Sequence, residues 1–122
     1  MARVTGIGGM FIRAKDPEAM AAWYHRVLGL PFSGEGGDTT AVLPNDGGEY
    51  AVFAFFPSDS DYIGDPQRQQ AMANLRVDDL DAVFAHLDEM GIAHEPAAEL
   101  EYGRFGWVVD PEGNRVELWQ PA

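Results

Sequence analysis

The sequence contains no cysteine, which excludes a disulfide framework, thiol catalysis and thiolate metal sites. Basic residues are also scarce: eight Lys and Arg stand against twenty Asp and Glu, so the net charge is −12 at pH 7. Nucleic acids and anionic membranes are recognised by basic surfaces, and the charge therefore argues against both as partners. No apolar run approaches the length of a bilayer span, and the first residues carry no signal-peptide core. We expect a soluble protein of the reducing cytoplasm.

The chain has 122 residues, enough for one domain, and its last part has the pattern of a β-hairpin. Asp110–Asn114, with the sequence Asp-Pro-Glu-Gly-Asn, has the residue types of a tight turn. Arg115–Trp119 then alternates polar and apolar residues, as a strand with two different faces does. Phe105–Val109 is the expected partner strand, and we expect the preceding Ala97–Gly103 to be a loop.

Two helices are marked by their end residues. Asp16 and Pro17 predict the start of a helix that Gly29 ends, and we expect Trp23 and Tyr24 to pack from it into the core. A second helix is expected at residues 80–90, capped by Asp78 and Asp79 and ended by Gly91. Between the helices, Gly and Pro predict a turn at residues 33–38 and a hairpin loop at 44–48.

The two halves of the chain resemble each other. Ile12–Asp16 matches Leu75–Asp79, and each is followed by a helix of similar length and then by strands. We therefore expect a single domain with one module at about residues 5–57, a linker at 58–70 and a second module at about 71–120. Side by side, two such modules would form a curved sheet with the helices on its outer face.

The period of two along each strand divides its residues between two faces. We expect these residues to face the helices: Ile12, Ala14, Leu75, Val77, Val116 and Leu118. The opposite, concave face then carries Gly9, Phe11, Arg13, Val52, Ala54, Phe56, Met72, Asn74, Arg76, Arg115, Glu117 and Trp119. Aromatic rings with a few convergent polar groups are typical of a ligand pocket. The alternatives are an ordinary solvated sheet face or an interface between the halves.

These motifs resemble the vicinal oxygen chelate superfamily, which contains glyoxalase I, the bleomycin-resistance proteins and the extradiol dioxygenases. The resemblance is carried over nearly the whole chain by Ile12–Pro17, Trp23–Leu30, Leu75–Leu80 and Asp110–Leu118. It implies an α+β fold in which two βαβββ modules form a cup-shaped mixed sheet with helices on the outer face. It also implies a homodimer.

Metal-dependent members of this superfamily hold a divalent ion on the concave strands. Carried over residue by residue, the ligand positions are Gly9, Ala54, Met72 and Glu117, of which only Glu117 has a ligating side chain. The histidines, His25, His86 and His94, fall on expected helices or near the edge, and we expect them to be solvated or capping residues. We therefore expect no metal site and no cofactor.

The resemblance also places Arg13 where glyoxalase-like relatives bind an anionic substrate group, with Arg76 as its equivalent in the second module. The expected ligand-binding residues on the strands are Phe11, Arg13, Phe56, Met72, Asn74, Arg76 and Trp119. A second group lies in the segment Glu99–Trp107, at Glu101, Tyr102, Arg104 and Trp107. It forms either a rim over the ligand or an anchored loop in which Arg104 pairs with Glu101.

These observations predict a metal-free binding protein for a small molecule with an aromatic or acyl part and an anionic group. The first alternative is a glyoxalase-like lyase or isomerase, or a dioxygenase, in which Glu117 acts as a general base or metal ligand. The second is a non-catalytic interaction module whose concave face is filled by its own side chains or by a partner chain.

Overall fold

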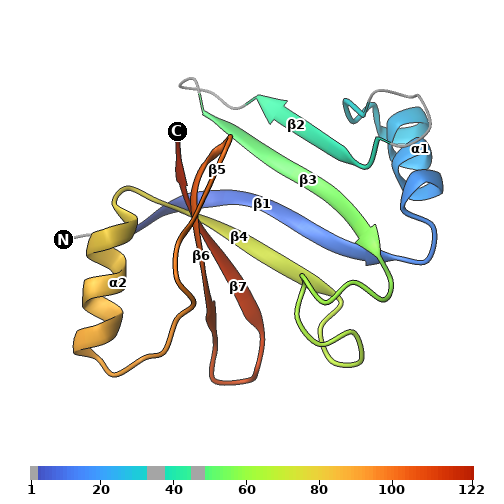
Figure 1. The fold of residues 1–122 in the computed structure, drawn as a ribbon. Helices are drawn as coiled ribbons and strands as arrows, with labels where there is room; N and C mark the ends of the chain where they lie inside the picture. The colour runs from blue at the N-terminus through green and yellow to red at the C-terminus, as the bar shows by residue number, and fades with distance from the viewer. Residues whose placement is uncertain (1–2, 33–37, 45–48) are drawn as a thin grey trace. The chain divides into compact units, whose positions relative to one another are not determined.

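The computed structural model describes residues 3–32, 38–44 and 49–122, which contain two helices and seven strands (Figure 1). The helices are α1 (Pro17–Leu28) and α2 (Leu80–Glu89). The strands are β1 (Val4–Ala14), β2 (Thr40–Pro44), β3 (Tyr50–Pro57), β4 (Ala71–Val77), β5 (Ala98–Leu100), β6 (Gly103–Val109) and β7 (Arg115–Pro121). Parallel and antiparallel pairs both occur, and the predicted α+β class with a mixed sheet is confirmed.

The chain divides into two compact units. We call Gly9–Met72 the N-terminal unit, and Met1–Gly8 together with Ala73–Ala122 the C-terminal unit. From β4 onward the elements follow the order βαβββ, and the described part of the first half follows the order β1, α1, β2, β3.

Helix α1 begins and ends where the sequence predicts. The Asp16 side chain accepts a hydrogen bond from the Ala19 amide at 3.1 Å, and Pro17 occupies the first turn. Gly29 takes the left-handed conformation at φ 71°, and its amide donates to the His25 carbonyl. These local bonds satisfy helix-end groups that would otherwise lack partners, which is why a few residues suffice to set both ends.

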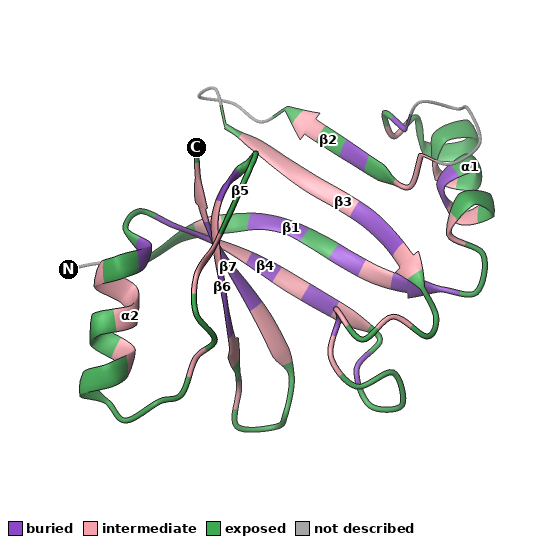
Figure 2. Ribbon diagram, viewed as in Figure 1, coloured by how far each residue is buried: buried purple, intermediate pink, exposed green. Residues whose placement is uncertain are grey.

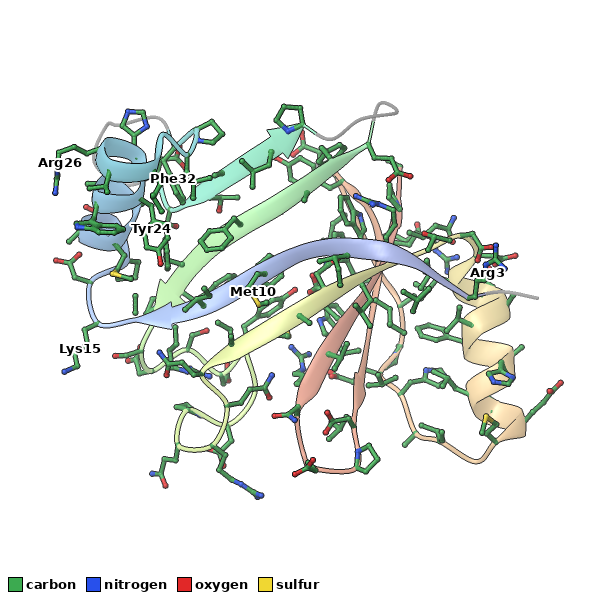
Figure 3. The ribbon with its side chains drawn as sticks, turned by 180° about the vertical axis from the view of Figure 1, so that it is seen from behind. Arg3, Met10, Lys15, Tyr24, Arg26 and Phe32 are labelled. Atoms are coloured by element: carbon green, nitrogen blue, oxygen red, sulfur yellow. The ribbon has the colours of Figure 1, made fainter. Side chains whose placement is uncertain are left out.

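In the N-terminal unit, α1 packs on one face of a sheet in which β3 lies between β2 and β1. The core here contains Ala14, Ala21, Phe32, Ala41 and Phe55, with Ile12, Met20, Tyr24, Leu30 and Phe53 packed against it. Ile12 and Ala14 therefore face the helix, as the period of two predicts. Figure 3 shows Tyr24 and Phe32 on the sheet side of α1 and Arg26 on its outer side.

The two aromatic residues of α1 differ in burial. Tyr24 packs on Phe53 and Phe55, with ring centroids 5.7 and 5.1 Å away. The prediction that Trp23 is also a core residue is wrong, because 45% of it is exposed. Helical spacing identifies the apolar side of a helix but not its width, and Trp23 lies beyond the part that the sheet covers.

In the C-terminal unit, the strand order from one side is β1, β4, β7, β6, β5. Strands β4 and β7 are parallel, with Asn74 opposite Glu117, and β6 pairs with β7 in antiparallel fashion. Helix α2 is capped by Asp79, and its Leu80 is buried in a core with Val77 and Leu118. Burial alternates along β4, which separates the helix-facing residues from those of the other face (Figure 2).

The turn between β6 and β7 is formed as predicted. The Asp110 carboxylate accepts hydrogen bonds from the amides of Glu112 and Asn114, both at 2.9 Å, and from the Asn114 side chain at 3.0 Å. The bonds from Asn114, first of all the one from its amide, hold the pKa of Asp110 below its ordinary value.

Two predictions for the segment before β6 need correction. Residues 98–100 form the short strand β5, which pairs with β6, so the expected loop at Ala97–Gly103 is for the most part a hairpin. Arg104 does not pair with Glu101. It pairs with Asp81 at 2.9 Å and with Glu99 at 3.4 Å. Asp81 lies 23 positions away in the sequence, a distance that local reasoning does not reach.

The turn expected at 33–38 and the hairpin loop expected at 44–48 fall largely outside the described residues. Within the described ranges, neither helix has the length and apolar character that crossing a membrane requires.

Candidate functional site

Glu117 lies at the centre of the C-terminal unit and has no exposed surface. One carboxylate oxygen accepts a hydrogen bond from Asn74 Nδ2 at 2.6 Å, and the other accepts one from Trp107 Nε1 at 2.9 Å. The strand registers bring this about, because Asn74 on β4 and Trp107 on β6 are the direct neighbours of Glu117 on β7. The carboxylate is therefore held from both sides by N–H donors.

This arrangement does not fit a divalent metal ion. Each Glu117 oxygen accepts one hydrogen bond from a buried donor, and a single carboxylate supplies too few ligands for a divalent ion. The other positions that the resemblance assigns to ligands carry Gly9, Ala54 and Met72, whose side chains offer no nitrogen or oxygen. Among the described residues, no group of three or more His, Asp or Glu side chains gathers in a way that could hold a metal.

Trp119 is also buried on this face of the C-terminal unit. Its indole N–H donates to the Tyr102 carbonyl at 2.9 Å, and its ring is stacked with Phe105 at 6.0 Å. The Arg76 guanidinium lies over the ring, 5.5 Å from its centroid. A positive charge and a flat apolar surface therefore meet at Trp119, in accordance with the cation–π preference of Arg.

Asn74 and Trp119 both approach the backbone of β1 at Gly8. A Cβ atom added to Gly8 would lie less than 3.0 Å from Asn74 Oδ1 and from Trp119 Cε3. Asn74 is buried, and its Oδ1 has no hydrogen-bond partner within the described part of the chain. The absence of a side chain at Gly8 is what allows these two groups their positions.

In the N-terminal unit, the Arg13 guanidinium is buried and bonded to main-chain carbonyls. Its acceptors are the carbonyls of Gln69 at 3.2 and 3.3 Å, Gly64 at 3.2 Å, Ser58 at 3.3 Å, and Ser60. Arg13 thus fastens the segment that connects β3 and β4 to the end of β1. The resemblance assigns this residue to an anionic ligand, and here its donors are occupied by the chain itself.

Three aromatic rings of the N-terminal unit form a cluster on the face opposite α1. Phe56 and Tyr62 are stacked, with centroids 5.4 Å apart and planes 7° apart, and Phe11 lies 5.4 Å from Phe56. Tyr62 comes from the connecting segment that Arg13 holds. Met72, also predicted here, is completely buried. The cluster provides a flat apolar surface of the kind that rings and acyl chains contact.

The predicted rim residues are dispersed. Glu101 and Tyr102 are exposed in the turn between β5 and β6, while Trp107 is buried beside Glu117. The Arg115 guanidinium lies 4.9 Å from the centroid of the Trp107 ring. Arg104 donates to Asp81, and this bond lowers the pKa of Asp81 and raises that of Arg104. The described geometry makes Trp107 a support of Glu117 and Arg104 a surface ion-pair partner.

His25 and His86 are exposed on the helices, as predicted, whereas His94 is partly buried. The His25 ring is hydrogen-bonded to the Leu30 carbonyl at the end of α1. His94 is bonded to Asp88 at 2.9 Å and stacked on Phe84.

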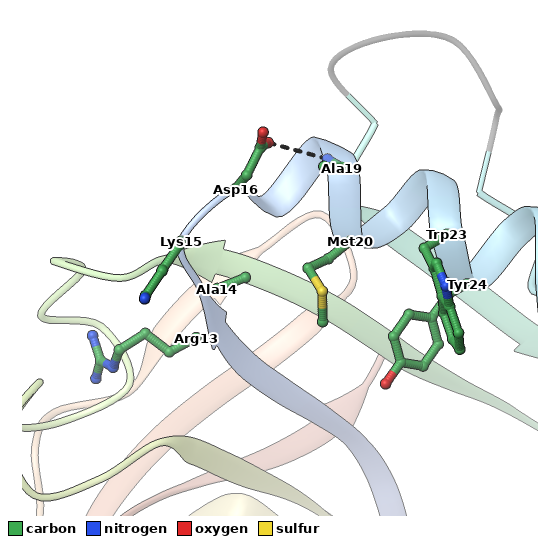
Figure 4. Close-up of a pocket in the computed structure, with 8 residues that line it drawn as sticks. All are labelled: Arg13, Ala14, Lys15, Asp16, Ala19, Met20, Trp23 and Tyr24. Carbon is green, nitrogen blue, oxygen red and sulfur yellow. Dashed lines mark hydrogen bonds between the residues drawn. The ribbon is translucent and has the colours of Figure 1, made fainter.

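A pocket that the sequence reasoning missed lies in the N-terminal unit between the end of β1 and α1 (Figure 4). Its volume is about 680 Å³, and it is lined by residues 13–16 and by Ala19, Met20, Trp23 and Tyr24. Two of the lining residues, Ala14 and Ala19, are small, and they stand beside three much larger side chains. No pattern in the sequence marks these residues as the lining of a pocket.

A family model, Glyoxalase/Bleomycin resistance protein/Dioxygenase superfamily, matches residues 6–118. A search of curated protein sequences gave no match.

Several solved structures share the fold. Methylmalonyl-CoA epimerase from Mycobacterium tuberculosis superposes with a TM-score of 0.70 and 24% identity, over 98% of this chain and 89% of that one. A variant of the Streptomyces coelicolor methylmalonyl-CoA epimerase, in complex with 2-nitronate-propionyl-CoA, superposes with a TM-score of 0.71 and 16% identity, over 98% of this chain and 99% of that one. A glyoxalase/bleomycin resistance protein/dioxygenase superfamily member from Vibrio splendidus 12B01 superposes with a TM-score of 0.59 and 16% identity, over 98% of this chain and 99% of that one. At these identities the similarity establishes the fold alone.

Proposed function

The chain belongs to the Glyoxalase/Bleomycin resistance protein/Dioxygenase superfamily, and from this premise we propose that it binds a small molecule without transforming it. The proposed ligand has an aromatic or acyl part and an anionic group. It contacts, within one unit, the sheet face that the helix of that unit leaves uncovered, and no metal ion takes part in binding it.

The state of Glu117 is the observation that carries the proposal. It is the acid that the resemblance places at a metal-ligand or base position, and both of its oxygens accept hydrogen bonds from buried donors. Hydrogen bonds to a charged group contribute about 1.5–3 kcal/mol each, and a donor left buried without its acceptor costs a further penalty. Glu117 cannot turn toward a substrate or an ion without losing these bonds, so a structural role is favoured.

The side chains on the uncovered sheet face of each unit support a ligand with an aromatic or acyl part and an anionic group. In the N-terminal unit the stacked rings of Phe56 and Tyr62, with Phe11 beside them, offer a surface for a ring or an acyl chain. In the C-terminal unit Arg76 over Trp119 combines positive charge with an aromatic face. A carboxylate next to an apolar group is complementary to such a pair.

A ligand screen tests the proposal. Thermal unfolding is measured with ring-bearing and acyl carboxylic acids, and a true ligand at about 100 times its Kd stabilises the fold by about 2.7 kcal/mol. Phe56→Leu keeps the apolar character but removes the flat ring, and it is expected to weaken binding by roughly two- to tenfold. If neither acids nor acyl thioesters raise the unfolding temperature, the faces are filled surfaces and the proposal fails.

A second candidate is favoured by the structural neighbours, several of which are methylmalonyl-CoA epimerases. In this alternative Glu117 would remove a proton from the carbon next to a thioester. Incubation with methylmalonyl-CoA in heavy water, with and without added divalent metal ions, measures such proton removal as deuterium uptake by mass spectrometry. We expect no uptake above that in buffer. Uptake that Glu117→Gln abolishes would replace binding with catalysis.

The homodimer and the cytoplasmic location also belong to the proposal. The superfamily resemblance supports the first, and the cysteine-free composition supports the second. Light scattering coupled to gel filtration tests the dimer, because one chain has a mass of 13.4 kDa and a dimer twice that value.

A further inference from the structure

We propose that the pocket between α1 and the end of β1 is a separate binding site for a carboxylic acid that carries a ring or a short acyl chain. It lies on the helix side of the N-terminal unit. The cluster of Phe11, Phe56 and Tyr62 lies on the opposite face, so the two sites do not share their aromatic residues.

The apolar part of the pocket has the size and lining of a ligand site. Its volume of about 680 Å³ lies within the range of roughly 300–1,000 Å³ that small-molecule sites occupy. Met20, Trp23 and Tyr24 form one end, as Figure 4 shows, and the Trp23 and Tyr24 rings meet edge to face at 5.1 Å. Trp23 leaves 45% of its surface exposed, which is unfavourable for a large apolar ring in water. A ligand ring against Trp23 would remove this surface from water.

The other end of the pocket carries positive charge, and Lys15 is the group that can offer it to a ligand. Arg13 also lies there, but its guanidinium is bonded to carbonyls of its own chain. The Asp16 carboxylate is directed away to the Ala19 amide (Figure 4). No acidic residue within the described ranges forms an ion pair with Lys15, which is exposed.

Lys15 is the only lysine in the sequence, in a chain whose net charge is −12. Most of the surface of such a chain repels anions, so an anionic ligand needs a local cation. Lys15 is part of the lining of an apolar pocket and lies just before the N-terminus of α1, whose partial positive charge acts in the same direction. A ligand that places its carboxylate at Lys15 and its ring at Trp23 therefore matches the charge at one end of the pocket and the apolar surface at the other.

The single lysine permits a direct test. Reductive methylation with ¹³C-formaldehyde labels the Lys15 amine and the chain N-terminus, and it preserves the positive charge. The labelled protein is titrated with 2-naphthoate and, as the matched neutral probe, with 2-naphthamide. We expect a saturable NMR shift of the Lys15 methyl signal with the acid and affinity two- to fivefold lower, roughly, for the amide, which is the range of an exposed ion pair. Equal affinity for both probes, or a Lys15 signal that does not move, overturns the proposal.

Substitutions of single residues test whether the acid binds in this pocket. Lys15→Met is expected to weaken 2-naphthoate binding roughly two- to fivefold without affecting 2-naphthamide, and Lys15→Arg to retain the preference for the acid. Trp23→Ala is expected to weaken both probes by about tenfold or more. Val27→Ala, on an exposed residue of the same helix outside the lining, controls for changes in the helix itself.

Trp23 supplies a second readout, because Trp107 and Trp119 are buried. Bound 2-naphthoate should protect Trp23 fluorescence from quenching by iodide, whereas Phe56→Leu should leave this protection unchanged. No protection of Trp23, together with acid binding that Phe56→Leu weakens, would assign the acid to the opposite face and overturn the proposal for this pocket, while leaving the proposed function intact.

Discussion

At the scale of single residues, the packing around Gly8 decides how Asn74 and Trp119 are held. A methyl group at this position would overlap both side chains, neither of which has room to withdraw from the buried face of β4 and β7. We therefore expect Gly8→Ala to lower the free energy of unfolding by about 1–3 kcal/mol, as overpacking does. Urea denaturation followed by circular dichroism measures the change.

Gly6→Ala is the matched control. Its added Cβ would meet only an Arg76 nitrogen, at 3.5 Å, which is an ordinary contact. This variant should be as stable as the parent or slightly more so, because alanine suits a strand interior better than glycine. Equal stability of the two variants would show that the tight packing around Gly8 has no energetic consequence.

Arg13 links the residue scale to that of elements, because one side chain holds the segment between β3 and β4. Arg13→Met removes its charge-assisted hydrogen bonds, each contributing about 1.5–3 kcal/mol, and local opening of the segment should become at least about tenfold more frequent. Trypsin reports this opening by cleavage after the exposed Arg68 in the same segment. The control is Arg26→Met on the outer side of α1, and equal cleavage rates in both variants would contradict the bracing role.

At the scale of elements, the β6–β7 turn makes a prediction about pH. Hydrogen bonds to the ionised Asp110 lower its pKa in the folded state below the ordinary value of about 3.9. The bonds therefore stabilise the fold at pH values above that ordinary value, and the stabilisation is lost as the pH falls through the lower, folded-state pKa. NMR titration of the Asp110 carboxyl should show this lowered pKa. Asn114→Ala removes the side-chain bond and keeps the bond from the amide, so it should move the pKa only part of the way back toward about 3.9. An unchanged titration in the variant would exclude the Asn114 side chain as a cause.

The helices and strands also show which structural features could be predicted from the sequence. Caps such as Asp16 and Gly29 act within one turn of chain, and the strand phase of Ile12 and Ala14 follows from the backbone period, so both were predictable. The exposure of Trp23 was not, because it depends on how far the neighbouring sheet extends.

The candidate site was predictable only in part, for a related reason. Period-two counting placed Glu117 and Asn74 on one face, but the pairing of Glu117 with Trp107 depends on the register between strands. The acceptors of Arg13 are carbonyls of residues 45 to 56 positions away, and carbonyls carry no sequence signal. The pocket beside α1 arises from the fit of side chains on separate elements, which no local pattern encodes.

At the scale of the whole molecule, the excess of acidic residues predicts a response to salt. Twenty Asp and Glu against eight Lys and Arg give mutual repulsion that the ion pairs of Arg104 and Arg115 offset only locally. Raising NaCl from about 10 mM to about 150 mM shortens the Debye length from roughly 30 Å to roughly 8 Å, so repulsion is screened more than close contacts are. Tm measured by calorimetry should therefore rise. A falling Tm would mean that the attractive pairs dominate.

The closeness of β1 and β3 at Gly9 has a consequence for the redesign of this chain. A Cβ atom there would come within 3.0 Å of the Val52 carbonyl oxygen, so the backbone leaves no space for an imidazole. One substitution at position 9 therefore cannot install a chelating side chain, since the neighbouring strand must first shift to admit the new group. Attempts to engineer metalloenzyme activity into this scaffold should begin with the spacing of these strands and install the ligands afterwards.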